Sequence, residues 1–178
     1  MNVKTTIYQV LFQQYKNRIY SYSLLMLKNR MDAEDVTQDV LIKIWNNLNS
    51  FKIAAAKTWI MKTTHNQCID YLRKRSKESQ RDLSFDEELF TATENEIYLL
   101  NPMYKTHVIM MADKVKEAIQ KLPENLRSIF ILFELHGMKY KEISKSLDIP
   151  MNSVKVYLLR ARKRLQEELK NYKSQEVL

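Results

Sequence analysis

The 178-residue sequence predicts an all-α fold of two small helical domains joined by an acidic linker, the second domain containing a helix-turn-helix. A single glycine and three prolines leave little from which to build hairpin turns, whereas helix interiors need neither residue. The distribution of charged residues also divides the chain into two basic segments and an acidic one between them. Residues 1–77 carry 13 basic and 5 acidic side chains, residues 78–112 carry 2 and 7, and residues 113–178 carry 14 and 9. We therefore expect domains at 1–77 and 113–178, with the linker at 78–112.

Three helices are predicted in the first domain, because apolar residues recur at steps of three and four. The first covers residues 5–29 with the stripe Ile7, Leu11, Tyr15, Ile19, Tyr22 and Met26. The second begins at Asp32, an expected N-cap, and buries Ala33, Val36, Val40, Ile44 and Leu48. The third covers about residues 57–77 and buries Ile60, Thr64, Cys68 and Leu72. These stripes are the predicted core of the domain.

The second domain is predicted to contain four helices. One covers about residues 107–121, and Pro123 opens the next, which stops at His136-Gly137, where a helix end often requires a left-handed backbone. Two more cover residues 139–147 and about 152–171, joined by the short turn Asp148-Ile149-Pro150. A short turn between two helices at a steep angle is typical of a helix-turn-helix.

The last helix presents a basic face. The apolar residues of this helix are expected to face the core. The opposite, exposed side then carries Lys155, Val156, Arg160, Lys163 and Arg164. A helix fits the DNA major groove, where Arg and Lys pair with guanine or phosphate oxygens. A charged helix alone is more often a solvated surface, but the preceding helix and turn favour DNA binding.

A second candidate surface lies along the third helix. Trp59 can stack on an unpaired base, and Lys62, Asn66 and Arg73 can follow a phosphate backbone or read a base edge. The alternative is structural: Trp59 belongs to the core, and Asp70 pairs with Arg73 and Lys74 at helical spacing. The sequence leaves both interpretations open.

The second helix carries acidic side chains that would repel DNA. Its positive N-terminal dipole explains the carboxylates of the first turn, but not Gln38 and Asp39 beyond it. We therefore expect a basic protein partner on this face.

The sequence argues against an enzyme and against a metal-binding protein. The single glycine rules out a P-loop and argues against a dinucleotide-binding fingerprint. The three histidines are scattered, and the single cysteine, Cys68, is expected to be a small buried hydrophobe. We expect no catalytic residues, metal, cofactor or small-molecule substrate. A lone cysteine and the lack of a signal peptide or an 18-residue apolar run favour the cytoplasm, without membrane insertion.

Several motifs together resemble the extracytoplasmic-function sigma factors of the sigma-70 family, over nearly the whole chain. The segment Asp32-Ala33-Glu34-Asp35-Val36-Thr37-Gln38-Asp39-Val40 with Ile44-Trp45 resembles the helix that binds the polymerase clamp. Trp59-Ile60 through Asn66 and Ile69-Asp70-Tyr71-Leu72-Arg73 resemble the minus-ten-element helix. Leu122-Pro123-Glu124-Asn125-Leu126-Arg127, Tyr140-Lys141-Glu142-Ile143, Ser153-Val154-Lys155 and Arg160-Ala161-Arg162 resemble the minus-thirty-five-element domain.

The resemblance implies a chain that binds core RNA polymerase and directs promoter recognition and melting. It implies polymerase contacts at Asp35, Gln38, Asp39 and Trp45. It implies minus-ten contacts at Phe51, Lys52, Trp59, Lys62, His65, Asn66 and Arg73, with a flipped base captured by residues 49–56. It implies minus-thirty-five contacts at Asn152, Ser153, Lys155, Val156, Tyr157, Arg160 and Lys163. The family's habits also imply an anti-sigma factor as a partner, in some cases linked to the membrane.

Some positions depart from the family pattern. His65 stands where an arginine is common, which implies a weaker or pH-dependent phosphate contact. Val156 and Tyr157 replace a small hydroxyl residue and an arginine, and they offer apolar surface to a thymine methyl. Asp148 stands where the turn usually has glycine. The alternative function is a two-domain helix-turn-helix regulator that acts without joining polymerase.

Overall fold

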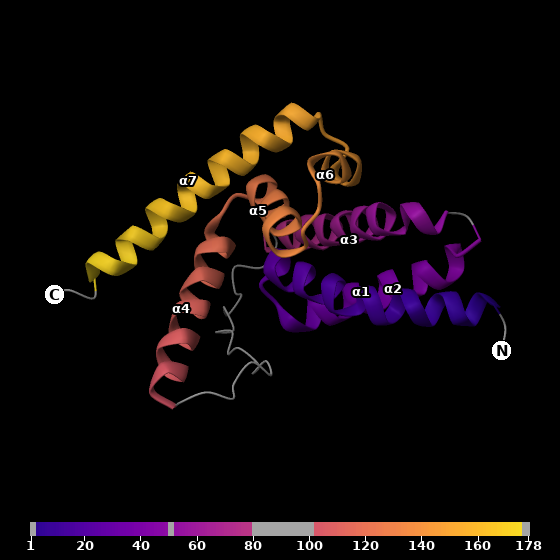
Figure 1. The fold of residues 1–178 in the computed structure, drawn as a ribbon, viewed down its shortest axis with the longest axis horizontal. Helices are drawn as coiled ribbons and strands as arrows, with labels where there is room; N and C mark the ends of the chain where they lie inside the picture. Colours follow the sequence, from indigo (N-terminus) through magenta and orange to yellow (C-terminus); the bar gives the residue numbers. More distant parts are fainter. Residues whose placement is uncertain (1–2, 50–51, 80–101, 176–178) are drawn as a thin grey trace.

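The computed structural model describes residues 3–49, 52–79 and 102–175, and every regular element in these ranges is helical. The N-terminal group contains α1 (Val3–Leu27), α2 (Arg30–Asn47), the short 3-10 turn η1 (Ile53–Ala55) and α3 (Ala56–Ser79). The C-terminal group contains α4 (Pro102–Lys121), α5 (Glu124–Phe130), the π-helical turn η2 (Ile131–Leu135), α6 (Tyr140–Leu147) and α7 (Met151–Gln175). Figure 1 shows α1, α2 and α3 side by side, with α6 against α3.

The predicted stripes of the N-terminal helices form its core. Leu11, Tyr15, Ile19, Tyr22 and Met26 are buried on α1, while Ile7 is only partly buried. The predicted stripes of α2 and α3 are likewise buried, except Leu48, which directly follows α2, and Leu72 on α3, both of which are half-buried. Cys68 is fully buried, as predicted.

The predicted N-cap of the second helix was wrong. Helix α2 is capped by Asn29, whose side-chain oxygen accepts a hydrogen bond from the backbone N–H of Asp32 at 3.0 Å. Asp32 lies in the first turn, where its carboxylate faces the positive end of the helix. The cap lies three residues earlier than predicted because α1 ends at Leu27 and Lys28 reverses the chain with a φ of 57°.

The C-terminal group begins earlier than predicted. Helix α4 starts at Pro102, inside the range expected to be linker, and proline is favoured at the first position of a helix. Residues 78–79 of that expected linker belong to the end of α3, and residues 80–101 lie outside the described residues. Gly137 ends the following helical segment with a φ of 60°, the left-handed conformation that was predicted for the only glycine.

Helices α6 and α7 form the predicted helix-turn-helix. In Figure 1, α6 is viewed nearly end-on while α7 crosses the picture, so the two are steeply inclined. Asp148 takes the left-handed conformation at the end of α6, with a φ of 58°. The Ser144 hydroxyl donates to the carbonyl of Ile149 at 2.7 Å, and the Ile149 N–H donates to the carbonyl of Ser144 at 3.1 Å. These bonds fix the turn and hence the angle between the helices.

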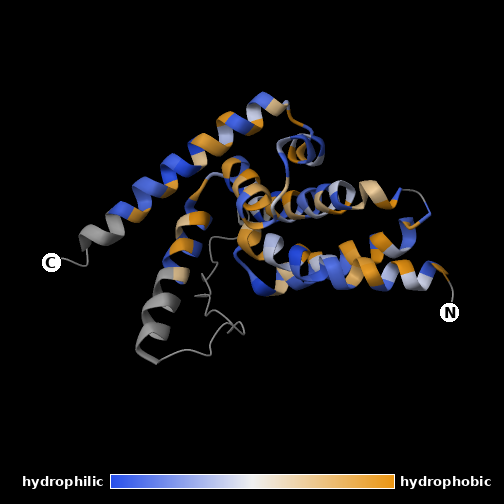
Figure 2. Cartoon of the chain, in the orientation of Figure 1, coloured by the Kyte–Doolittle hydropathy of each residue, from blue (hydrophilic) through white to orange (hydrophobic). Residues whose placement is uncertain are grey.

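The two groups of helices share one continuous hydrophobic core. Buried apolar residues of α1, α2 and α3 and of α4 to α7 belong to a single cluster, and the polar residues lie on the outer faces (Figure 2). Helix α6 packs on α3, while α4, α5 and η2 pack on α1. The sequence predicted the two groups but gave no indication that they would be packed together.

Candidate nucleic-acid and polymerase interfaces

Helix α7 presents the basic face that the sequence predicted. Its inward side chains Val154, Leu158, Ala161 and Leu165 are buried, which turns the opposite side of the helix to solvent. The side chains exposed there are Asn152, Lys155, Val156, Arg160, Lys163 and Arg164. Tyr157 is different, because it is half-buried against the core. The predicted contacts other than Tyr157 and the half-buried Ser153 therefore lie on an accessible surface.

An open groove of about 490 Å³ lies between the start of α5 and the middle of α7. Three cations line it, Arg160, Lys163 and Arg164, together with Pro123, Asn125, Leu126 and Glu167. A concave surface with three cations suits a phosphate-bearing backbone. Asn125 lies in the Leu122-to-Arg127 motif but is not among the predicted contacts, and it lines this groove from the start of α5.

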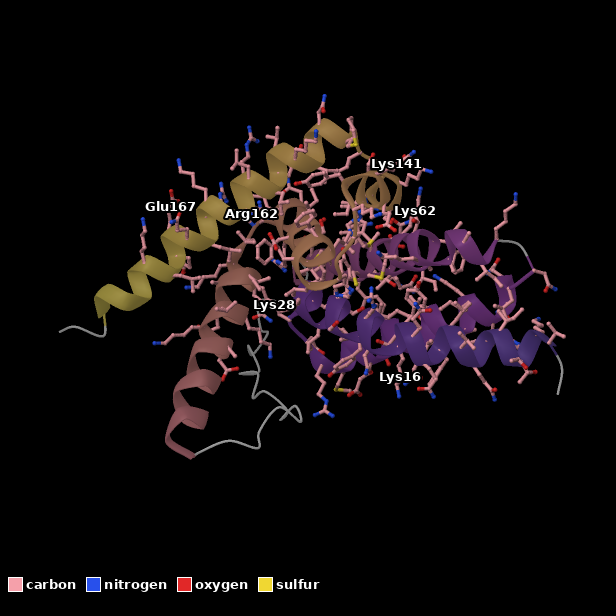
Figure 3. All side chains as sticks on the ribbon, viewed as in Figure 1. Lys16, Lys28, Lys62, Lys141, Arg162 and Glu167 are labelled. Carbon is pink, nitrogen blue, oxygen red and sulfur yellow. The ribbon has the colours of Figure 1, made fainter. Side chains whose placement is uncertain are left out.

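Contacts with η2 and α6 hold α7 in place. Arg162 donates from Nε to Oε1 of Glu134 at 2.8 Å and lies 5.5 Å from the centre of the Phe133 ring (Figure 3). The Phe133 ring in turn stacks on Tyr140 at 5.0 Å between centroids, with an interplanar angle of 11°. Arg162 is therefore held by its own domain, whereas Arg160 and Lys163 point into the groove.

The polar face of α3 is partly exposed. Asn66 and Arg73 are exposed, and Arg73 lies 3.7 Å from the Asp70 carboxylate in a solvated pair. Trp59 is half-buried and packs against the core. The packing of Trp59 and the Arg73–Asp70 pair agree with the structural interpretation, and the DNA contacts of this helix stay a prediction. Of the residues expected in the preceding loop, Lys52 is exposed and Phe51 lies outside the described residues.

His65 is turned toward the protein interior. Its Nδ1 lies 2.8 Å from the hydroxyl of Tyr22, and burial lowers the pKa of His65 to about 4. The Tyr22 ring also meets His136 edge-on, at 6.1 Å between centroids. Burial, helped by Arg18 and Lys57 nearby, lowers the pKa of His136 to about 4. Both imidazoles are therefore neutral at pH 7, and the phosphate contact expected of His65 stays a prediction.

The acidic face of α2 is open to solvent. Asp35 and Gln38 are exposed, while Asp39 is half-buried and accepts a hydrogen bond from Nε2 of Gln67 on α3 at 3.0 Å. Trp45 meets the Tyr8 ring edge-on at 5.2 Å and remains 38% exposed. The exposed Ile42 lies near the same end of the helix. This face combines carboxylates with apolar surface, so it is complementary to a partner surface that carries basic and apolar side chains.

Within the described ranges, no group of three or more His, Cys, Asp or Glu side chains is placed to hold a metal ion. The helices of those ranges include none that is long and apolar enough to cross a membrane.

A helix-turn-helix with a basic groove, packed beside a helical group with an acidic face, defines a DNA-binding transcription protein. Two models of one family match the chain: "Sigma-70 region 2" over residues 11–78 and "Sigma-70, region 4" over residues 112–165. The chain belongs to the sigma-70 family of RNA polymerase sigma factors, in its extracytoplasmic-function (ECF) group. It directs RNA polymerase to promoters and is a non-catalytic subunit.

Known relatives agree with this assignment. The ECF RNA polymerase sigma factor SigM of Bacillus subtilis is 28% identical over 155 residues, which cover 87% of this chain and 90% of SigM. SigE of Mycolicibacterium smegmatis is 24% identical over 165 residues, and here the match covers 93% of this chain but only 62% of the relative. The fold is similar to that of the sigma factor RpoE from Bartonella quintana, solved with the anti-sigma factor NepR. That match has a TM-score of 0.76 and 23% identity and covers 91% and 96% of the two chains.

Proposed function

We propose a division of labour among three surfaces of this sigma factor. The basic face of α7, with the groove beside α5, binds the minus-thirty-five element of the promoter. The polar face of α3, with Lys52 before it, binds the minus-ten element and helps to open it. The face of α2 that carries Asp35, Gln38, Asp39 and Trp45 binds the polymerase clamp. The observation that carries the proposal is the separation of charge: the α7 groove has three cations, whereas α2 exposes carboxylates.

The exposed side chains of α7 match the phosphate groups and the base edges of promoter DNA. Arg160, Lys163 and Arg164 supply charge for phosphate oxygens, and an arginine can also pair with guanine. Val156, which is 45% exposed near the start of the helix, offers apolar surface to a thymine methyl. Opening the minus-ten element costs a few kcal/mol for each unstacked base, which a stacking residue can offset. Trp59 is the candidate for that role, although it is half-buried in this conformation.

The protein is expected to act in the cytoplasm, where polymerase is present and where Cys68 stays a thiol. An anti-sigma factor is its expected inhibitor, since RpoE of Bartonella quintana forms such a complex.

Run-off transcription with purified core polymerase, with and without this chain, tests the proposal on a pool of promoters. In a pull-down with core polymerase we expect Asp39→Arg to abolish association. Asp35→Arg should do so too, and it is the cleaner variant because Asp35 is exposed, whereas Asp39 also accepts from Gln67. Asp113→Arg on α4 makes the same charge reversal away from α2 and should bind normally. Undiminished binding of both α2 variants would rule out the clamp assignment.

A gel shift with promoter duplex tests α7. Arg160→Ala should weaken binding by about 1–3 kcal/mol if the guanidinium reads a base. Lys16→Ala is the matched control, because Lys16 is an exposed cation on α1, away from the groove (Figure 3). Equal shifts for the two variants would show that Arg160 does not read the promoter.

A further inference from the structure

We propose that Gln67 on α3 is a positioning residue for polymerase binding: its side-chain amide fixes the Asp39 carboxylate and holds the Lys43 ammonium away from it. Gln67 thereby keeps the negative charge of Asp39 available to a basic side chain of the polymerase. The inference rests on the proposed role of Asp39 in clamp binding, and it gives α3 a part in that binding as well as in promoter opening.

Gln67 uses both ends of its amide to join two side chains of α2. Its Nε2 donates to Oδ2 of Asp39 at 3.0 Å, and the Lys43 ammonium donates to Oε1 of Gln67. All three residues are half-buried, so water competes less with these hydrogen bonds than it does on an open surface. Asp39 and Lys43 are therefore connected through a neutral amide.

The spacing of Asp39 and Lys43 makes this amide important. The two residues are four positions apart on α2, where a carboxylate and an ammonium commonly pair directly. Among the ion pairs of the described residues, none joins these two side chains, and Gln67 connects them instead. Without Gln67, the flexible Lys43 side chain is free to pair with Asp39 and to neutralise its charge.

Helix α3 also influences the acidic face of α2 one turn beyond Gln67. Burial raises the pKa of the Tyr71 hydroxyl, and the nearby charges of Asp35 and Asp39 raise it further. The carboxylates of α2 therefore lie within electrostatic reach of α3. A substitution on the side of α3 that faces α2 can alter how these carboxylates meet a partner.

A carboxylate that is already fixed binds a partner more tightly than a mobile one. Ordering a side chain on binding weakens an interaction by about two- to tenfold. Asp39 is ordered by Gln67 before the polymerase binds, so this loss is avoided. The donor is neutral, which leaves the full negative charge of Asp39 to attract a basic partner.

A binding titration of the full chain with purified core polymerase tests the inference. Gln67→Leu keeps a side chain of similar size but removes both hydrogen bonds, and we expect it to weaken binding about three- to tenfold. Asp39→Ala should also weaken binding, and adding Gln67→Leu to it should change nothing further, because Gln67 acts through the Asp39 carboxylate. Equal losses from Gln67→Leu with and without Asp39 would overturn the proposal, because they would show a merely structural role.

A substitution of Lys43 separates neutralisation of Asp39 from damage to the packing of α2 on α3. In the Gln67→Leu chain Lys43 is free to pair with Asp39, so Lys43→Met should strengthen binding about twofold or more. In the wild-type chain the same substitution should have a much smaller effect, since Gln67 already holds the ammonium. Equal effects of Lys43→Met in the two chains would refute the role assigned to Gln67.

Gln166→Leu makes the same change at an exposed position of α7 and is the matched control, which should bind polymerase normally. If circular dichroism shows that Gln67→Leu does not fold, Gln67→Asn replaces it, because an amide one carbon shorter cannot reach both partners at once. Normal binding by Asp39→Ala would refute the clamp role of Asp39 itself. Normal binding by Gln67→Leu, alongside weakened binding by Asp39→Ala, would refute only the positioning role of Gln67.

Discussion

Acid should destabilise this protein through two buried histidines. His65 and His136 both meet the ring of Tyr22, which is fully buried between the two groups of helices. Each pKa is lowered from its ordinary value of 6.5 to about 4, in both cases mainly by burial. In the tautomer whose Nδ1 accepts from the Tyr22 hydroxyl, protonation of His65 would also remove that acceptor, because an imidazolium nitrogen can only donate.

The direction and size of this loss of stability follow from the difference between the histidine pKa values in the folded and the unfolded chain. Between pH 6.5 and pH 4 the unfolded chain binds a proton at each histidine and the folded chain does not, so stability is full above pH 6.5 and falls as the pH is lowered. Lowering the pH from 7 to 5 should cost about 2 kcal/mol for each histidine, since each full pH unit inside this window costs about 1.4 kcal/mol. The pair together should cost about 4 kcal/mol, a large share of a typical domain's stability.

Urea unfolding followed by circular dichroism at pH 7, 6 and 5 measures this loss. The variants His65→Gln and His136→Gln remove one titrating group each and keep a polar side chain. Each should reduce the loss between pH 7 and pH 5 by about 2 kcal/mol, whatever the carboxylates contribute, because their contribution is common to all chains. An equal loss in the wild type and in the double variant would refute the reasoning, as would an imidazole that titrates near 6.5 by NMR.

Three further outcomes are expected. Arg127→Met should destabilise the chain by about 1–3 kcal/mol in urea unfolding, because it leaves the Met26 and Leu122 carbonyls without their donor; an unchanged midpoint would mean that water replaces the guanidinium. Leu158→Ala should cost about 2–5 kcal/mol, since Leu158 is 1% exposed in the core, and a smaller loss in thermal unfolding would indicate that α7 repacks. The Cys68 thiol should react with a maleimide only on unfolding, so rapid labelling of the native chain would contradict its burial.

Local features of the fold were predictable from the sequence. Periodicity gave the helices, and Gly137 and Asp148 took the left-handed conformations expected of them. The N-cap of α2 was predicted wrongly as Asp32, because the sequence does not show that α1 ends early enough for Asn29 to take that position. The start of α4 at Pro102 was also not predicted, because the acidic stretch before it led us to assign this proline to the linker.

The exposed residues of the candidate site could be predicted from the sequence where all of them lie on the same helix. Arg160 and Lys163 on α7 and Asp35 and Gln38 on α2 are exposed because the opposite faces of those helices are apolar. Asn125 was not among the predicted contacts, because it joins the groove from another helix. The inward turn of His65 was missed because an imidazole on a helix does not reveal the tyrosine that will meet it from elsewhere in the chain.

The sequence by itself determined the helices, the helix-turn-helix and the charge of each exposed face, since these depend on neighbours within about four positions. Only the tertiary structure decided that the two domains share a core. The contacts responsible join residues far apart, such as Arg127 to Met26 and Lys57 to Glu142. Such long-range pairs produce no pattern in the sequence. Nothing in the sequence distinguishes the lysine and the glutamate that form an ion pair from those that stay exposed to water, because folding alone brings the pair together.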